Sequence, residues 1–362
     1  MAFYSEASNL VPGDTNSAED VFVRDRASGT TRRVSVDSAG NEGDGDSYDP
    51  VLSADGRFVV FYSDATNLVA ADTNGVADVF LHDCLTGVTT RLSVDSAGNQ
   101  GNGASLYPWI SADGRTVTFH SSADNLVPLD TNQVSDVFVR DLVAGTTVRV
   151  SVDSAGAQGN GDSSYSSLSA DGRYVAFESL ATNLVPSDTN NRKDIFVRDL
   201  VGGTTRRVSV HSSGAQSNGA STYGAISGDG RSVGFESLAS NLVTGDTNGF
   251  VDSFVHDLVT GTTERISLSS AGVQGNNISL RAVPSHDGRF VAFKSHASNL
   301  VAGDTNGAQD IFLRDRLFGT TQRVSVDSSG AQAQGHSSTP ALSADGRHVG
   351  YYSFAENLVP GD

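Results

Sequence analysis

The sequence predicts an all-β protein assembled from a tandem repeat of 58 residues. Two motifs carry this prediction, because each occurs six times and both have the same spacing. One motif is Ser-x-Asp-Gly-Arg, and the other is Asp-Thr-Asn. Equal steps without insertions indicate equivalent structural units, so the repeat takes precedence over any other interpretation of the fold. The Asp-Thr-Asn copies begin at Asp14, Asp72, Asp130, Asp188, Asp246 and Asp304.

Each repeat is expected to form four short strands joined by turns. In the second repeat the strands are residues 48–52, 58–62, 78–83 and 89–94. The Asp-Gly pair between the first two strands predicts a hairpin turn, since glycine supplies the positive φ that such turns require. The second and third strands are apolar on both faces, as in a sheet packed between two others, whereas the fourth alternates. No segment keeps a helical period, and a linear β-solenoid would need capping units that the sequence does not show.

Four-stranded antiparallel sheets repeated around an axis form a β-propeller, so six repeats predict six blades in a single domain, residues 1–362. Residues 1–14 and 349–362 are equivalent, with an offset of six repeats. We therefore expect the ring to be closed by one blade shared between the two ends, which leaves few open edges. One copy of the second strand is then surplus. Either residues 2–5 or residues 350–353 should be displaced, frayed or paired with a neighbouring chain.

The hairpin motif and the strand that follows it also carry a resemblance. The segment Ser169–Phe177 reads Ser-Ala-Asp-Gly-Arg-Tyr-Val-Ala-Phe, and Asp194–Asp199 reads Asp-Ile-Phe-Val-Arg-Asp. Together they resemble the TolB-like β-propeller repeat family, and all six repeats share the pattern. Two departures are the Ala, Gly or His in place of the family's turn proline and the longer loop that carries Asp-Thr-Asn. The family includes interaction modules, parts of peptidases and surface proteins, so the resemblance implies a fold more than a function.

The loop between the second and third strands contains the most regular polar pattern, with Asp, Asn and Asp at motif positions 1, 3 and 7. Calcium takes six to eight oxygen ligands, which this spacing can aim into a tight loop, with a backbone carbonyl added at position 5. Asn67 and its equivalents add a carbonyl or brace the loop. The motif has no Cys or recurrent His, which disfavours zinc. The predicted calcium ligands are Asp14, Asn16, Asp20, Asp72, Asn74, Asp78, Asp130, Asn132, Asp136, Asp188, Asn190, Asp194, Asp246, Asn248, Asp252, Asp304, Asn306 and Asp310.

The alternative for this motif is a metal-free Asx-turn, in which the Asp and Asn side chains accept hydrogen bonds from backbone N–H groups. The motif lacks the bidentate Glu at position 12 that calcium loops of the EF-hand type use. The Asp that ends each third strand, such as Asp83, is expected to accept hydrogen bonds of the following turn.

Charge and composition exclude several classes of function. The formal net charge is −18, with two lysines in the chain, so a nucleic-acid partner is not expected. No apolar run is long enough to span a membrane. A single cysteine, Cys84, excludes an intramolecular disulfide framework. No signal peptide precedes the first strand-like segment, and an extracellular or cell-surface location in a bacterium is expected.

The repeats differ mainly along the first strand and the loop before it, at two aligned positions: one holds Asp, Tyr, Tyr, Tyr, Arg and Thr in successive copies, and the other holds Val, Trp, Ser, Ala, Val and Ala. Aromatic and charged side chains at a propeller mouth can hold a peptide, a protein or a glycan, although ordinary drift is the alternative. The predicted ligand-binding residues are Asp49, Tyr107, Trp109, Tyr165, Tyr223 and Arg281. The eight histidines are scattered over the repeat and suggest no catalytic set. The sequence thus predicts a non-enzymatic, calcium-binding scaffold or binding module; the alternative is a carbohydrate- or peptide-processing or -binding propeller that uses its channel mouth.

Overall fold

The computed structural model describes residues 1–361, and these form strands, turns and bends but no helix. Accordingly, none of the described residues belongs to a helix that could span a membrane. The strands pair in antiparallel sheets, which confirms the all-β prediction. The chain contains two compact units, Met1–Val175 and Ala176–Asp362, and each is described separately.

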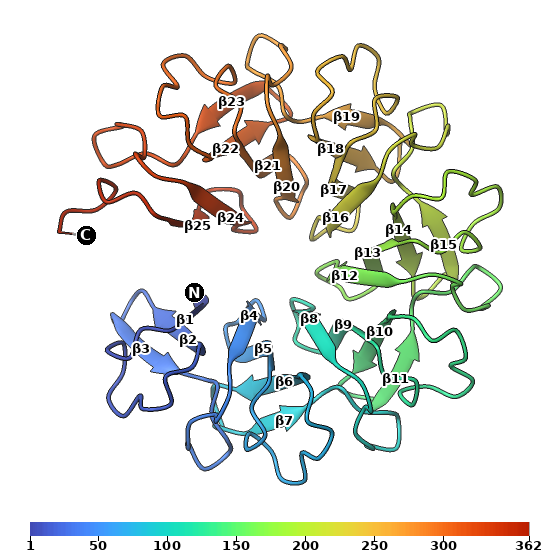
Figure 1. Cartoon of the computed structure of the whole chain (residues 1–362), viewed down its shortest axis with the longest axis vertical. Helices are drawn as coiled ribbons and strands as arrows, with labels where there is room; N and C mark the ends of the chain where they lie inside the picture. The colour runs from blue at the N-terminus through green and yellow to red at the C-terminus, as the bar shows by residue number, and fades with distance from the viewer. Residues whose placement is uncertain (362) are drawn as a thin grey trace. The chain divides into compact units, whose positions relative to one another are not determined.

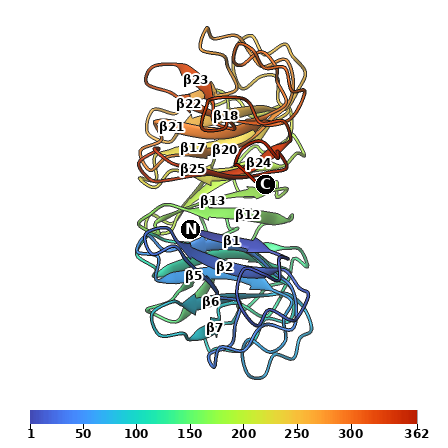
Figure 2. The same ribbon diagram turned by 90° about the vertical axis from the view of Figure 1, so that its left-hand side faces the viewer.

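The N-terminal unit begins with a three-stranded sheet and continues with two four-stranded sheets of consecutive strands. The sheets β4–β7 and β8–β11 lie side by side (Figure 1). The first sheet packs on the second through β1, β2 and β4, and Figure 2 shows β1 and β2 above β5, β6 and β7. The strands are β1 (Ala2–Ser5), β2 (Asp20–Asp25), β3 (Thr30–Arg33), β4 (Ser47–Leu52), β5 (Phe58–Ser63), β6 (Asp78–Asp83), β7 (Thr89–Arg91), β8 (Ser105–Ile110), β9 (Thr116–Ser121), β10 (Asp136–Asp141), β11 (Thr146–Arg149) and β12 (Ser163–Leu168).

The strand β13 (Tyr174–Ser179) contains the boundary between the two units. In the C-terminal unit, β14 pairs with β15, and the four-stranded sheets β16–β19 and β20–β23 and the two-stranded sheet β24–β25 follow. The strands are β14 (Asp194–Asp199), β15 (Thr204–Arg207), β16 (Ser221–Ile226), β17 (Ser232–Ser237), β18 (Asp252–Asp257), β19 (Thr263–Arg265), β20 (Ser279–Pro284), β21 (Phe290–Ser295), β22 (Asp310–Asp315), β23 (Thr320–Arg323), β24 (Ser337–Leu342) and β25 (Val349–Ser353).

The duplicated second strand is ordered in both of its copies. β1 pairs with β2, and β25 pairs with β24, so the described residues form seven separate sheets. Neither copy is frayed, and the displacement of one of them or its pairing with a neighbouring chain stays a prediction. Each copy keeps the partner that adjoins it in sequence, because a local antiparallel pair forms without any contact from the other end of the chain. Closure of a ring by a shared blade stays a prediction.

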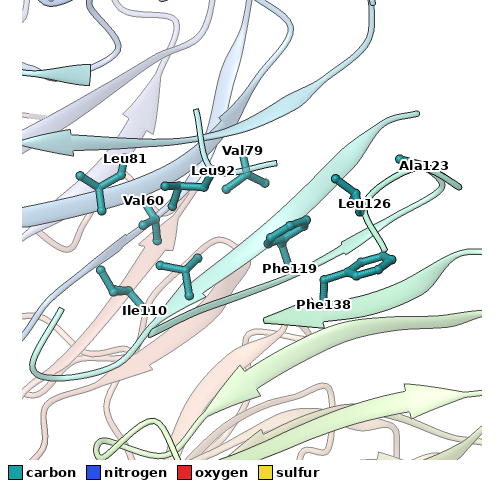
Figure 3. Close-up of a cluster of buried hydrophobic side chains, with 10 residues drawn as sticks. Val60, Val79, Leu81, Leu92, Ile110, Phe119, Ala123, Leu126 and Phe138 are labelled. Carbon is teal, nitrogen blue, oxygen red and sulfur yellow. The ribbon is translucent and has the colours of Figure 1, made fainter. Parts of the chain in front are cut away.

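The core of each repeat contains a pair of phenylalanines that face each other across the second and third strands. Phe61 and Phe80 are both fully buried, and their ring centroids are 5.9 Å apart. Phe119 and Phe138 repeat this pair at 6.0 Å and belong to the cluster of Figure 3, which fills the space between sheets β4–β7 and β8–β11. Burying an aromatic or aliphatic side chain of this size contributes about 1.5–3 kcal/mol.

The hairpin motif also forms as predicted. Asp55 accepts hydrogen bonds from the Ser53 hydroxyl and the Arg57 N–H, and the turn glycine that follows it has φ +70°. At the equivalent Gly114, a Cβ would lie 2.6 Å from the ring of Phe58 in the preceding repeat.

The fourth strand is shorter than predicted, since β7 ends at Arg91 rather than at residue 94. The reason is Ser93, whose side-chain oxygen accepts the hydrogen bond from the Val79 N–H. This side chain replaces a backbone acceptor, so the regular ladder stops before it.

Candidate functional site

The loop carboxylates that were predicted to bind calcium all surround the guanidinium of an arginine on the fourth strand. In the first repeat, Arg33 Nη1 lies 2.9 Å from Asp20 Oδ2 and 3.4 Å from Asp14 Oδ1. The arginine side chain is 9% exposed and Asp20 is fully buried, so the ions are shielded from water. A buried carboxylate requires such a partner, because desolvation of an unpaired charge is costly.

The same arrangement recurs in every repeat, with nitrogen–oxygen distances of 2.9–3.8 Å. The sequence analysis did not predict a role for this arginine, although it recurs at the same repeat position. The six arginines are Arg33, Arg91, Arg149, Arg207, Arg265 and Arg323, and each contacts the first and the last Asp of its own loop motif.

The asparagine at motif position 3 forms the Asx-turn that was the alternative to a metal ligand. Asn16 Oδ1 accepts a hydrogen bond from the Ala18 N–H at 3.0 Å. Its Nδ2 donates to the Gly43 carbonyl at 2.8 Å and to Asp20 at 3.3 Å. The amide therefore turns a donor, rather than its oxygen, towards the carboxylate.

These contacts do not fit a resident calcium ion. A guanidinium already lies between the two carboxylates, and a divalent cation beside it would be repelled. The Asn oxygen is directed to a backbone N–H group, and the buried Asp20 carboxylate also accepts the Ser35 hydroxyl at 2.5 Å. In the described part of the chain, no group of three or more His, Cys, Asp or Glu residues is arranged to hold a metal. Calcium binding by these loops stays a prediction, and the arginine gives the carboxylates a different role.

That role is to fix the long loop to the rest of the repeat. Burial raises the pKa of Asp78, while Ser93, Arg91 and Gln100 favour its charged form. Asn67 braces the loop: its Oδ1 accepts the Asp44 N–H, and its Nδ2 donates to the Glu42 carbonyl. The loop is therefore held by an ion pair, hydrogen bonds and the buried side chain of Leu68.

The Asp that ends each third strand accepts hydrogen bonds from the next turn, as predicted. Asp83 accepts the Leu85 N–H at 2.9 Å and a bidentate contact from Arg57 at 3.0 and 2.7 Å. The hydrogen bond from Arg57 holds the pKa of Asp83 well below its ordinary value. This residue is structural.

The variable position of the first strand has an unusual backbone. In five of the described first strands, the register shifts between the second and fifth residues, which marks a β-bulge. The residue at the bulge has φ between 44° and 57°, in the left-handed region that normally favours glycine. No repeat has glycine there. The six residues are Asp49, Tyr107, Tyr165, Tyr223, Arg281 and Thr339.

In the N-terminal unit the bulge side chains join a row of half-exposed aromatic rings. Tyr62 stacks between Tyr48 and Tyr107, with centroid distances of 5.3 and 5.4 Å. Tyr107 is 4.5 Å from Tyr165 and 5.4 Å from the His120 ring. Four of the predicted ligand-binding residues are in this unit: Asp49, Tyr107 and Tyr165 at the bulge, and Trp109, which pairs with Thr118 two residues further along β8.

In the C-terminal unit, charged groups occur both at the bulge, as Arg281, and at the second-strand position equivalent to Tyr62, as Glu178, Glu236 and Lys294. The Arg281 guanidinium lies 3.9 Å from the centroid of Tyr223, and the Arg281 N–H donates to Glu236 at 2.8 Å. Glu178 accepts the Tyr223 N–H at 3.0 Å and pairs with Lys193 at 2.6 Å. Burial raises the pKa of Glu236 and lowers that of Lys294. The sequence predicted Tyr223 and Arg281 but missed the second-strand partners, although these vary within otherwise near-constant strands.

The chain is similar in fold to several solved propellers. It shares 15% identity with TolB of Agrobacterium tumefaciens, with a TM-score of 0.50, covering 84% of this chain and 87% of that one. The β-propeller domain of the Trilobed protease from Pyrococcus furiosus, which has an open velcro topology, gives 11% identity, a TM-score of 0.52 and coverage of 86% and 79%. TolB from Acinetobacter baumannii gives 16% identity and a TM-score of 0.48. The match covers 89% of this chain but only 62% of that one, so this chain spans less than two thirds of its length.

Two other comparisons add little to the fold. Residues 216–334, less than half of the chain, match the family model of the phage T7 tail fibre protein, N-terminal domain. No curated protein matches the chain. The structural likenesses confirm a TolB-like β-propeller fold.

Proposed function

We propose that this TolB-like β-propeller chain is a non-enzymatic binding module, which contacts a protein, peptide or glycan through the variable side chains of the first and second strands. The observation that carries the proposal is the left-handed backbone of the bulge residue in six repeats, none of which has glycine there.

Strain of this kind costs about 1–3 kcal/mol at each residue and persists at positions where function uses the side chain. A bulge with a purely structural purpose is served best by glycine, which adopts a positive φ without strain. Here Tyr107, Tyr165, Tyr223 and Arg281 carry large, half-exposed side chains instead. Aromatic side chains of this type bury area at low entropic cost and still offer a polar hydroxyl to a ligand.

The rest of the repeat supports a rigid frame for these side chains. In the proposal, six blades form one ring closed by a blade shared between the chain ends, and the ion-paired loops stiffen its rim. An extracellular, cell-surface location suits a binding module of this acidity. Calcium at the loops is not required by the proposal, because the arginines supply a cation there.

The test is a screen of peptide and glycan arrays against the unaltered chain, followed by two substitutions in different units. At least one of the substitutions Tyr107→Ala and Arg281→Ala is expected to weaken binding of the selected ligand at least tenfold. Leu85→Ala is the matched control, since this side chain is 76% exposed and belongs to a turn far from the bulge in the repeat. An array without any ligand, or a ligand that tolerates both substitutions, contradicts the proposal. Turnover of a bound glycan or peptide would support the processing enzyme instead.

A further inference from the structure

Three tyrosines and three carboxylates gather where the first two sheets of the N-terminal unit meet. Tyr4 contacts Tyr48 edge-to-face at 5.6 Å, and Tyr48 stacks on Tyr62 at 5.3 Å. Burial and the nearby negative charges of Asp46 and Glu19 raise the pKa of Tyr48 to about 12. We call this set the tyrosine–carboxylate cluster; its members are Tyr4, Tyr48, Tyr62, Glu19, Asp46 and Asp49.

One carboxylate oxygen of the cluster is buried and has no hydrogen-bond donor among the described residues. Glu19 Oε2 is enclosed by the protein and accepts no hydrogen bond from any described residue. The Glu19 N–H donates to Asp46 at 2.8 Å, which brings the two acids together. Burial raises the pKa of Glu19, and Asp46, Glu6 and Asp49 raise it further. A buried acceptor without a donor is destabilising, so this oxygen is suited to an N–H group that arrives with a ligand.

The C-terminal unit shows what the equivalent positions do when a cation is present. The repeat equivalents of Tyr4 and Glu19 are Glu178 and Lys193, which form an ion pair of 2.6 Å. The repeat equivalent of Asp49 is Arg281, whose guanidinium lies on the face of Tyr223 at 3.9 Å. These backbone positions thus hold one cation, Lys193, against a carboxylate and another, Arg281, against a tyrosine in the C-terminal unit. In the N-terminal unit these positions carry tyrosines and acids.

We propose that the tyrosine–carboxylate cluster binds a primary ammonium or guanidinium group, supplied by a lysine or arginine side chain of a partner peptide. This inference rests on the proposed function, since it gives the ligand class for one part of that site. Tyrosine faces attract cations through their negative quadrupole, and charge-assisted hydrogen bonds to carboxylates add to this attraction. The bare Glu19 oxygen favours an N–H donor over a quaternary ammonium, which has none. The net charge of −18 attracts a basic partner from a distance.

The experiment measures binding of a tetralysine peptide by calorimetry at 0.15 M salt. Lysine-acetylated tetralysine and tetramethylammonium are the negative probes, and spermidine tests whether a free polyamine is the source of the ammonium group. Glu19→Gln and Tyr4→Leu are each expected to weaken binding of tetralysine at least tenfold. Glu356→Gln is the matched control, because it removes one exposed negative charge in another repeat.

Equal losses in the Glu19 and Glu356 variants would reduce the effect to general charge and overturn the inference, as would equal binding of the acetylated peptide. Tighter binding of spermidine than of tetralysine would overturn the assignment to a peptide. Thermal unfolding of each variant checks its fold, and Tyr4→Leu, at a 44% exposed side chain, keeps the test valid if Glu19→Gln misfolds. If cations fail but a ligand from the arrays is lost on Tyr107→Ala, the inference falls while the proposed function stands.

Discussion

Replacing Arg265 with methionine removes the cation from one loop and leaves two aspartates without it. Asp252 is fully buried, and Asp246 is 5% exposed; the guanidinium lies 3.3 and 3.7 Å from them. Removing one partner of a buried ion pair costs about 3–5 kcal/mol, because the remaining charge stays desolvated. Asp252 keeps hydrogen bonds from Ser267 at 2.6 Å and Asn248 at 3.0 Å, so we expect the lower end, about 3 kcal/mol.

The assay is urea and thermal unfolding, each with EDTA or with calcium. A loss of about 3 kcal/mol corresponds to a midpoint lowered by about 6–12 °C for a unit of this size. Adding Asp252→Asn to Arg265→Met should restore part of the loss, because the second change removes the uncompensated charge. Arg347→Met is the control, since Arg347 is exposed and belongs to a turn.

Chelation of calcium should have no effect on the unaltered chain. EDTA should leave its midpoint unchanged, because the guanidinium already occupies the place between the two carboxylates. A midpoint that falls with EDTA and returns with calcium would refute this reasoning and establish the calcium prediction. A change of less than about 1 kcal/mol for Arg265→Met would refute the assigned strength of the ion pair.

Three further predictions concern the turns and the bulge. Thr339→Gly should raise the free energy of unfolding by up to about 1 kcal/mol, because Thr339 is exposed with φ 44°; a fall in the urea midpoint contradicts this. Arg57→Met should raise the pKa of Asp83 in an NMR titration, because Arg57 lowers that pKa. The contribution of this ion pair to the free energy of unfolding is therefore present above the ordinary pKa of Asp83 and is lost as the pH falls through the lowered pKa. Gly114→Ala should destabilise the chain by at least about 1 kcal/mol more than Gly40→Ala in urea, since both have positive φ but only Gly114 faces the phenylalanine ring described above.

The strands of the repeat could be predicted because their signals are local. The Asp-Gly turn, the apolar second and third strands and the Asp after the third strand are each specified within a few residues. The end of the fourth strand could not be predicted in this way. It depends on the Ser93 side chain, which accepts the hydrogen bond of the Val79 N–H, fourteen residues earlier, in place of a backbone carbonyl. The bulge was missed for a similar reason: Tyr107 is a poor left-handed residue, and its local sequence therefore predicts a regular strand.

The loop site illustrates a limit of spacing as a guide to metal binding. Asp, Asn and Asp at positions 1, 3 and 7 predict a cation between the two carboxylates, and the structure does place one there. The spacing does not reveal whether the charge is a metal ion or an arginine, since that depends on a fourth strand thirteen residues after the last Asp, as for Arg33 and Asp20. A recurrent arginine in the same repeat is the signal that distinguishes the two.

These contacts give the constant and the variable positions of the repeat different roles. The constant residues of the repeat, such as Arg265, Asp252 and Ser267, satisfy one another and are buried, so substitution of any one leaves another unpaired. The bulge positions make contacts mainly with each other, as Tyr107 does with Tyr165 and as Tyr223 does with Arg281 at the equivalent positions two repeats later. Such a pair can change from two rings to a cation and a ring without disturbing the buried ion pairs. The frame therefore tolerates variation at the one place where each repeat presents half-exposed aromatic and charged groups, and this is the property that a binding surface requires.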